Sequence, residues 1–510
     1  MSIASYLSDT IASSVDFSTY IDRYKDTLRT AFRRRLDLDA QSLKRGFPSF
    51  LMRQVQSCTP LSVFIPATYG GRGAKVSECL SVLEASSYES LALSLTMGIN
   101  GALFLQPVSK YGQEDVKAEA FRRFLQDKAL GGLMITEPEY GSDALSMQTS
   151  FTQEGNAYVI QGTKQWAGLT GMADFWLLTA RERDAQGNLG RDVGFFVCDA
   201  QQPEQHIEVE EYFNNLGLYF IPYGRNRVNV RVPAVQRLEP KTTGIKMMLD
   251  LLHRSRMQFP GMGMGYLRRM LDEAVQHCRE RYVGGQSLFN YDQVKERLAR
   301  LQAYYTSCSA MCAYASEHAS TERELATESI PANAIKTVVT DFMQEASQSL
   351  LQLTGAKGYR LDHIAGRSTV DSRPFQIFEG SNDILYQQIS EGILKLMRRS
   401  KETNLHAFLS SYALTSRAAE YFKDTLNFNV DLSLPQRKLV DLGQLLGRVI
   451  TMEFTIDLGS RGFHSDLISN ALTVLRQDVD ALVTRVGTPL QSAVVEDYTE
   501  DSGWLQYTRA

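Results

Sequence analysis

The chain has 510 residues, of which 43% are apolar and 22% are charged, a composition that is typical of folded globular proteins and excludes bulk disorder. Its 54 basic and 58 acidic residues give a formal net charge of −4, so charge indicates neither a nucleic-acid partner nor an anionic membrane. A chain of this length exceeds one ordinary hydrophobic core, and we expect several domains.

The predicted elements begin with helices, continue with strands and return to helices. Apolar residues at helical spacing mark the first part, which a turn-forming segment at 65–73 interrupts. From Gly131, short β-branched and aromatic runs between Gly, Asn and Asp predict strands, and long helical patterns return after Thr243. The predicted helices cover 5–15, 20–36, 79–95, 245–259, 266–282, 291–318 and 334–353, and the predicted strands 158–166, 174–182, 193–200, 207–213 and 227–232.

A further helical layer is predicted after about Arg399, with segments at 405–426, 436–454 and 468–487. We therefore predict an α+β fold that is mainly helical. The predicted parts are an N-terminal α-helical domain at 1–128, a middle β domain at 129–240, a C-terminal helical domain at 241–400 and a helical extension at 401–510.

The cysteines and the N-terminal segment favour a cytoplasmic protein. Six cysteines are scattered along the chain, and only Cys308 and Cys312 lie close together, at helical spacing and without nearby paired ligands. We expect reduced core thiols and no metal site. Residues 1–18 lack a basic segment followed by an apolar one, and the sequence has no run of eighteen apolar residues, so we expect no integral membrane contact.

Two segments in the predicted β domain carry groups that suit a ligand. In MITEPEYGSDA, at 134–144, a strand-like entry leads into a turn where Thr136 and Ser142 can offer hydroxyl and N–H groups to a flavin ring or a pyrophosphate. An ordinary surface turn is the alternative. Trp166, in GTKQWAG, ends a predicted strand, and its indole either lies against a flat cofactor or packs in the core.

Two further segments lie in the C-terminal helical domain. Gly261 and Gly265, after Arg256, share one helical face, and without a preceding strand they indicate helix packing instead of a dinucleotide fingerprint. Glu379 ends an apolar segment before a helix that is predicted to begin near residue 383 or 384. Beside Phe378 this carboxylate would be partly desolvated, with a pKa raised toward that of a general base. A glutamate that merely favours the helix dipole is the alternative.

The order and spacing of TEP-x-x-GSD, G-x-K-x-W, an Arg-led helix and EGS-N resemble the acyl-CoA dehydrogenase family. The resemblance covers roughly residues 20–400, including YGGRG at 69–73 and LQLTGAKGY at 351–359. It implies an N-terminal helical domain, a middle β-barrel or sandwich domain and a C-terminal four-helix bundle, followed here by appended helices. It also implies FAD, held between subunits.

By the family's pattern, Glu379 is the catalytic base that removes the pro-R Cα proton while the Cβ hydrogen leaves as hydride to flavin N5. The flavin ribitol 2′-hydroxyl and the backbone N–H of Glu379 would polarise the thioester carbonyl. Some relatives carry the base directly before the helix arginine, but that position here is Ser255. Arg281 would reach the cofactor of a neighbouring subunit. The cofactor contacts implied are Thr136, Gly141, Ser142, Trp166, Arg281, Gln352, Gly355, Ser381 and Asp383, and the substrate contacts Ser142, Arg256 and Gly380.

The resemblance implies α,β-dehydrogenation of an acyl-CoA or acyl-carrier-protein thioester, with an electron-transfer flavoprotein or another acceptor. We expect a homo-oligomer, a dimer before a tetramer. Three positions depart from the family's pattern. Gly168 replaces a Ser or Thr that bonds flavin N5, and residues 169–170 could compensate for the lost hydroxyl. The segment 281–285 lacks the family's phenylalanine, and Lys357 interrupts a glycine-rich turn.

Three alternatives stay open, and the loss of the hydroxyl at Gly168 bears on the first of them. An oxygen-dependent oxidase or monooxygenase would keep the scaffold, as would a flavoprotein with a non-catalytic binding role. The DNA-protective branch of the family has a basic extension, whereas 401–510 lacks the Arg and Lys density that phosphate binding needs. The extension could also dock on a membrane or a partner, or pack on the core of its own chain.

Overall fold

The N-terminal part of the chain is helical, as predicted. The computed structural model describes residues 15–35, 45–488, 493–495 and 503–508, so the helix predicted at 5–15 falls almost wholly outside them. The helix predicted at 79–95 is two helices, because Ser90 adopts an extended conformation and its hydroxyl caps the second one at Leu93 N–H. The helices are α2 (Phe17–Thr30), α4 (Ser49–Gln56), α5 (Val76–Glu89), α6 (Leu91–Asn100), α7 (Gln106–Tyr111) and α8 (Glu114–Arg122), with π-turns at Ala31–Arg35, Gly101–Leu105 and Arg123–Asp127.

One helical stretch in the described residues, Leu91–Tyr111, is long and apolar enough to cross a membrane. However, 94% of its most apolar window is buried inside the protein. A central helix of a globular domain has the same composition, and core packing accounts for the apolar surface of this one.

The middle domain is a single curled, mixed sheet in the order β1-β4-β2-β3-β7-β6. β4 pairs with β1 and β2 along one edge and with β5 along the other. All five predicted strands are present. β1 ends at Met134, where the strand-like entry to the 134–144 turn is predicted to begin. The short β2 has no predicted counterpart, since Phe151 and Thr152 are its only residues with high β-propensity. The strands are β1 (Gly131–Met134), β2 (Ser150–Glu154), β3 (Ala157–Gln165), β4 (Phe175–Arg183), β5 (Leu189–Asp199), β6 (Glu208–Tyr212) and β7 (Gly224–Pro233).

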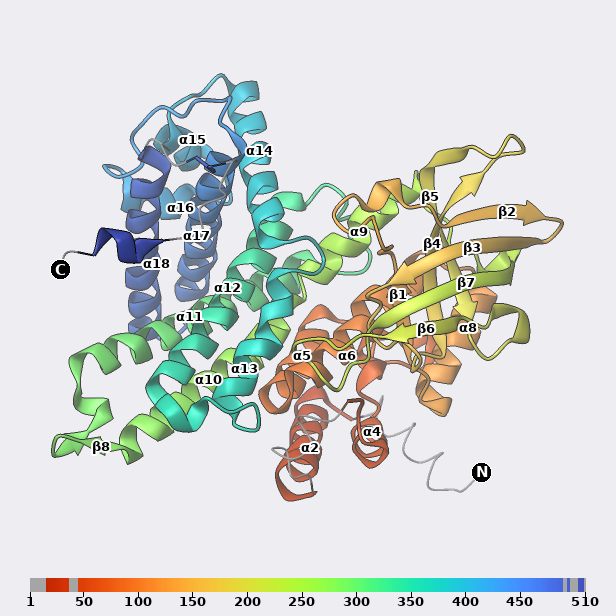
Figure 1. The fold of residues 1–510 in the computed structure, drawn as a ribbon, viewed down its shortest axis with the longest axis horizontal. Helices are drawn as coiled ribbons and strands as arrows, with labels where there is room; N and C mark the ends of the chain where they lie inside the picture. The colour runs from red at the N-terminus through yellow and green to blue at the C-terminus, as the bar shows by residue number, and fades with distance from the viewer. Residues whose placement is uncertain (1–14, 36–44, 489–492, 496–502, 509–510) are drawn as a thin grey trace.

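The C-terminal domain is a bundle of four long helices, which occupies the centre of Figure 1. The helix predicted at 245–259 ends earlier, at Arg256, and a new helix begins at Phe259 with Pro260 in its first turn. Gly261 and Gly265 allow that helix to lie against α5; a Cβ at Gly265 would stand 2.0 Å from the Glu84 carbonyl oxygen, which confirms the packing role. The helices are α9 (Gly244–Arg256), α10 (Phe259–Glu280), α11 (Asp292–His318), α12 (Ser329–Thr354), α13 (Ile364–Ser372) and α14 (Asn382–Ser400).

The extension packs on the bundle at the blue end of Figure 1, where α17 and α18 lie against α11, α12 and α14. The prediction of one helix at 405–426 is wrong, because α15 ends at Ser411 and Tyr412 adopts an extended conformation. The Thr415 hydroxyl then donates to the Leu409 carbonyl. The helices are α15 (Leu405–Ser411), α16 (Ser416–Ala419), α17 (Gln436–Ser460) and α18 (Ser465–Gly487).

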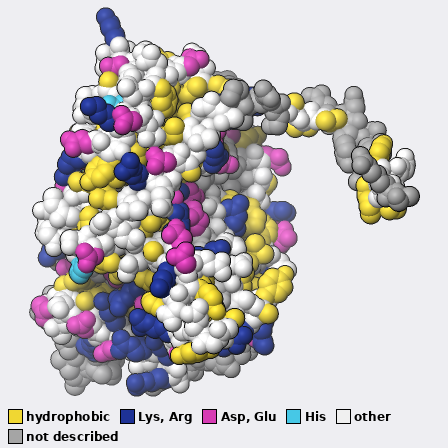
Figure 2. All heavy atoms as spheres, turned by 90° about the vertical axis from the view of Figure 1, so that its left-hand side faces the viewer, with side chains coloured by type: hydrophobic (Ala, Val, Ile, Leu, Met, Phe, Trp, Pro, Cys, Tyr) yellow, Lys and Arg dark blue, Asp and Glu magenta, His cyan; other side chains and the backbone are white. Residues whose placement is uncertain are grey.

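Charge is balanced over the extension. Residues 401–487 contain nine basic and ten acidic side chains, and Figure 2 shows both signs interspersed with apolar groups over the upper part of this face, where the extension lies. Such a surface offers no concentrated positive field for phosphate groups. The predicted free thiols are confirmed, since all six cysteines are unpaired and five of them are buried.

Candidate active site

A cavity of about 280 Å³ lies where the N-terminal helical domain, the middle β domain and the C-terminal helical domain meet. It opens between α6, the turns that follow β1 and β3, helix α9 and the loop that precedes α14. Its inner part is apolar, with Leu95, Ile99, Leu103, Met248 and Leu252. The structure brings seven of the predicted site residues to this cavity: Thr136, Gly141, Ser142, Trp166, Arg256, Glu379 and Gly380.

A buried ion pair holds the turn after β1. The Lys164 ammonium lies 2.9 Å from the Glu137 carboxylate, and both side chains are almost fully buried. The carboxylate also accepts the backbone N–H groups of Gln148 and Thr149, which close the turn from its far side. Burial lowers the pKa of Lys164 to about 8, although Glu137 favours the charged ammonium. The turn is therefore a fixed structure, and at Gly141 the space that a Cβ would face is open.

Trp166 faces the cavity and is not a core residue. It follows β3 in the left-handed conformation, with φ of +58°, and its backbone N–H donates to the Gly224 carbonyl at 3.0 Å. The indole stands 4.5 Å from the Phe213 ring centroid and is 51% exposed. The indole is thus supported from one side and available to a flat ligand on the other.

Glu379 lies in a loop that holds its carboxylate at the cavity. Its φ is +55° and that of Gly380 is +93°. One carboxylate oxygen accepts a hydrogen bond from the Ser255 hydroxyl at 2.9 Å, while the other, Oε2, is buried without a partner. Burial raises the pKa of Glu379, against the opposing effects of Arg256, Ser255 and Lys336. The carboxylate makes no hydrogen bond to an N–H group of α14, which begins at Asn382.

Two buried cations fix the backbone of this loop. The Arg256 guanidinium donates to the Glu379 carbonyl at 2.6 and 3.1 Å and to Asn333 Oδ1 at 2.8 Å. Lys336 Nζ donates at 2.9 Å to the Gly380 carbonyl. Burial lowers the pKa of Arg256 to about 10 and that of Lys336 to about 7. The sequence prediction missed Lys336; its only signal was a cation within an otherwise apolar helical segment.

The turn after Trp166 offers no hydroxyl to the cavity. A Cβ at Gly168 would stand 2.7 Å from Ile99 Cδ1, so Ile99 occupies the space where a side chain would begin. Thr170 is fully buried, donates to the Ala167 carbonyl at 2.8 Å and accepts from Asn226. The idea that 169–170 compensates for Gly168 is therefore wrong.

The remaining predicted residues do not line the cavity. Ser381 and Asp383 stand at the start of α14, beside the Glu379 loop. Arg281 directly follows the 22-residue helix α10, whereas Arg256 precedes it. The helix that separates the two residues is about 33 Å long. Gln352 and Gly355 lie at the same far end of the bundle and are exposed. Within one chain, Arg281, Gln352 and Gly355 therefore cannot reach the cavity.

The departures at this far end have a structural reason. Gly284 and Gly285, with φ of +57° and +84°, form the two-residue turn of a hairpin between β8 (Tyr282–Val283) and β9 (Gln286–Ser287). A phenylalanine would not suit either position, because both need the left-handed conformation. Lys357 lies in an exposed 3₁₀ turn, where its charge is solvated.

The cavity residues fit a flavin beside an acyl chain. The half-exposed indole and the open side of the β1 turn suit a planar ring with polar edges, and the apolar inner part suits a hydrocarbon. The unpartnered Oε2 of Glu379 needs a group that can donate or yield a proton. No other described feature of the cavity satisfies that oxygen.

Three family models match consecutive parts of the chain: the acyl-CoA dehydrogenase N-terminal domain over 22–128, the middle domain over 132–229 and the C-terminal domain over 242–394. An acyl-CoA dehydrogenase of Bacillus subtilis is 24% identical over 68% of this chain and 90% of its own length. The rat very long-chain specific acyl-CoA dehydrogenase is 25% identical over 63% of this chain, which spans 49% of that relative.

The fold of most of the chain, including part of the extension, has a counterpart among solved structures. An acyl-CoA dehydrogenase complexed with FAD from Bacillus anthracis matches with a TM-score of 0.74 at 16% identity. The match covers 93% of this chain and 88% of that one. Residues 1–400 alone could not make up 93% of the chain, so the match also includes some of the appended helices.

Proposed function

The chain belongs to the acyl-CoA dehydrogenase family, and on that premise we propose that it oxidises the Cα–Cβ bond of an acyl thioester with Glu379 as base. Its class is that of oxidoreductases acting on CH–CH groups, and its cofactor is FAD. The observation that carries the proposal is the Glu379 carboxylate, with one oxygen bonded to Ser255 and the other unpartnered at an apolar cavity.

Each residue at the site has a defined task in this reaction. Glu379 Oε2 takes the Cα proton, and the hydrogen bond from Ser255 keeps the carboxylate aimed while the proton moves. Arg256 holds the Glu379 carbonyl. The N–H of Glu379 donates to no backbone acceptor among the described hydrogen bonds, so it would be available to the thioester oxygen. Bound FAD supplies the hydride acceptor for Cβ, so that loss of a proton and a hydride leaves a double bond.

The partners are part of the same proposal. The acyl chain would occupy the inner cavity, and the thioester would be carried by coenzyme A or an acyl-carrier protein. An electron-transfer flavoprotein or another acceptor would reoxidise the flavin. Because Arg281 and Gln352 lie at the far end of the bundle, they would reach the cofactor of a second copy in a dimer.

The test is anaerobic mixing of the purified flavoprotein with a panel of acyl-CoA and acyl-carrier-protein thioesters, monitored by bleaching of the flavin absorbance. We expect bleaching in the wild type, none in Glu379→Gln, and wild-type bleaching in Glu391→Gln, an exposed glutamate on α14. A protein that binds FAD yet is bleached by no thioester would refute the proposal.

An oxygen-dependent reaction is the second candidate, and the observation that favours it is the turn at Gly168. The hydroxyl that would bond flavin N5 is absent there, and Thr170 is turned into the core. The discriminating measurement is the reaction of the reduced flavin with oxygen. Reoxidation within seconds in air, with product formed in step, would favour the oxidase; slow reoxidation would favour the dehydrogenase.

A further inference from the structure

The loop that carries Glu379 requires support from its surroundings. Glu379 and Gly380 are consecutive residues in the left-handed region, and a residue with a side chain adopts that region only when neighbouring contacts impose it. Arg256 and Lys336 hold the two carbonyl groups inside the loop. Its two ends need separate anchors.

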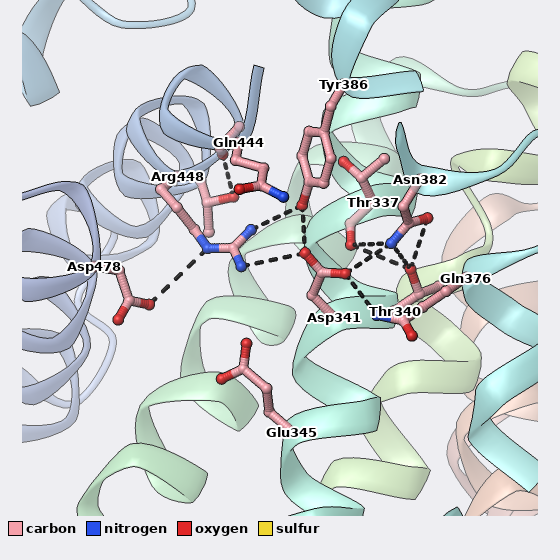
Figure 3. A network of polar contacts seen from close by, with 12 residues as sticks. Thr337, Thr340, Asp341, Glu345, Gln376, Asn382, Tyr386, Gln444, Arg448 and Asp478 are labelled. Atoms are coloured by element: carbon pink, nitrogen blue, oxygen red, sulfur yellow. Dashed lines mark hydrogen bonds and ion pairs between the residues drawn. The ribbon is translucent and has the colours of Figure 1, made fainter. Parts of the chain in front are cut away.

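A single carboxylate oxygen anchors both ends. Gln376, directly before the loop, donates its amide N–H to Asp341 Oδ1 at 2.8 Å. Asn382, directly after the loop, donates to the same oxygen at 2.7 Å. Figure 3 shows both amides converging on Asp341, which projects from α12. Movement of this carboxylate would loosen both ends of the loop together, although Asn382 keeps its hydrogen bonds to Lys336, Thr337 and Thr340.

The other oxygen of Asp341 faces the extension. Tyr386 donates its hydroxyl to Oδ2 at 2.6 Å, and the Arg448 guanidinium lies 3.3 Å from the same oxygen. Arg448 also donates to the Tyr386 hydroxyl at 3.0 Å (Figure 3). The side chains of Asp341 and Arg448 are 16% and 8% exposed. Among the described ion pairs, Arg448 is the cation paired with Asp341, and a carboxylate so far from water requires one.

Close packing prevents α17, which carries Arg448, from moving independently of α14. A Cβ at Gly443 of α17 would stand 2.0 Å from the Tyr386 carbonyl oxygen, so the two helices are in backbone contact. One turn further, the Ser390 hydroxyl donates to the Leu439 carbonyl at 2.6 Å. On the outer side, Asp478 of α18 lies 4.0 Å from the Arg448 guanidinium. The extension thus presents Arg448 in a fixed position.

We propose that Arg448 of the extension is a positioning residue for Glu379, because it neutralises and orients the Asp341 carboxylate that holds both ends of the Glu379 loop. This inference rests on the proposed function, but Arg448 does not line the cavity and takes no part in the chemistry. The extension is then a structural part of the active site, in contrast to a separate docking module.

The kinetic test uses the full-length FAD-loaded protein and a thioester that bleaches the wild type. We expect Arg448→Met and Asp341→Asn to slow flavin reduction at saturating thioester by about 10- to 100-fold, the effect of a small misplacement of a reacting group. The apparent dissociation constant of the thioester should stay near the wild-type value. The control, Arg461→Met, breaks an exposed ion pair between the extension and α11 and should leave both values unchanged.

Two rescue measurements separate positioning from general destabilisation. Arg448→Lys keeps the charge and should recover part of the rate, and added guanidinium should accelerate Arg448→Ala but not Glu379→Gln. In the Asp341→Asn background, Arg448→Met should have little further effect, because its target is already neutral. Equal rates in Arg448→Met and Arg461→Met, or an Arg448→Met effect that is as large in the Asp341→Asn background, would overturn the proposal.

A measurement that needs no substrate keeps this inference distinct from the proposed function. Hydrogen–deuterium exchange of the FAD-loaded protein should be faster in peptides covering 376–386 in Arg448→Met, or in Arg448→Lys if the first variant does not fold. Exchange in the middle β domain should match the wild type. Exchange at 376–386 that equals that of Arg461→Met would refute the positioning role, whereas the absence of thioester-dependent bleaching would refute the function alone.

Discussion

Replacing Lys164 with methionine removes the cation from beneath the turn that lines the cavity. In the wild type its ammonium donates to Glu137 at 2.9 Å, to the Ile135 carbonyl at 2.9 Å and to the Thr179 hydroxyl at 3.1 Å. Methionine has a similar length but no donor. The substitution therefore leaves the Glu137 carboxylate buried without its counter-charge.

We expect Lys164→Met to destabilise the middle domain by about 3 kcal/mol, the lower end of the range for breaking one side of a buried ion pair. The lower end applies because Glu137 keeps the backbone N–H groups of Gln148 and Thr149. In Lys164→Met/Glu137→Gln no charge remains buried, and we expect about 1–2 kcal/mol to be recovered.

Urea unfolding followed by tryptophan fluorescence measures this effect in the right domain. Trp176 is 3% exposed on β4, whereas Trp166 and Trp504 are already 51% and 65% exposed, so the spectral change reports mainly on the sheet. The control is Arg231→Met, which breaks an exposed ion pair with Glu154 in the same sheet and should cost at most about 1 kcal/mol. A loss in Lys164→Met no larger than in this control, or strictly additive effects in the double variant, would refute the reasoning.

Three further predictions concern the cavity itself. Glu379→Gln should raise the thermal stability at neutral pH while it abolishes bleaching. The folded state binds the proton of this carboxyl more tightly than the unfolded state, so its ionisation costs folding free energy as the pH rises through the raised pKa; a melting temperature that falls equally at all pH values would contradict this. Gly168→Ser should destabilise the protein by about 1–2 kcal/mol because the new Cβ displaces Ile99. In an Ile99→Ala background the same substitution should cost no stability, which a double-mutant cycle of urea midpoints would show. Additive effects of the two substitutions would exclude the clash. Gly380→Ala should slow flavin reduction at saturating thioester, because φ of +93° is strained for alanine and its Cβ would stand 3.0 Å from Leu385; an unchanged rate would show that the loop tolerates the strain.

Local chemistry made part of this site predictable. Trp166 and the Glu379 loop were located because a strand end and a Gly-flanked turn leave signals within a few residues of the side chains concerned. The five predicted strands are also present for a local reason, since β-branched and aromatic runs favour extended chain wherever they occur. The failed helix at 405–426 shows the limit, because the chain becomes extended at Tyr412 although the segment has no Gly or Pro to mark a break.

The partners of these residues could not be predicted in the same way. Ser255 is 124 residues from Glu379 in the chain, and Arg448 is 107 residues from Asp341. No periodicity or motif encodes such contacts, which arise only when packed helices bring their faces together. Gly168 was identified as a departure, but the reason, the methyl group of Ile99, also lies on a distant helix.

The most direct test of the central claim is hydrogen exchange at Cα of a thioester whose β-carbon is replaced by sulfur. Such a ligand has no β-hydrogen to lose as hydride, so only the step assigned to Glu379 can occur. Incubation in D₂O with the FAD-loaded protein should place deuterium at Cα in the wild type and in Glu391→Gln but not in Glu379→Gln, as NMR of the recovered ligand would show. Exchange in Glu379→Gln at the wild-type rate would contradict the assignment of the base.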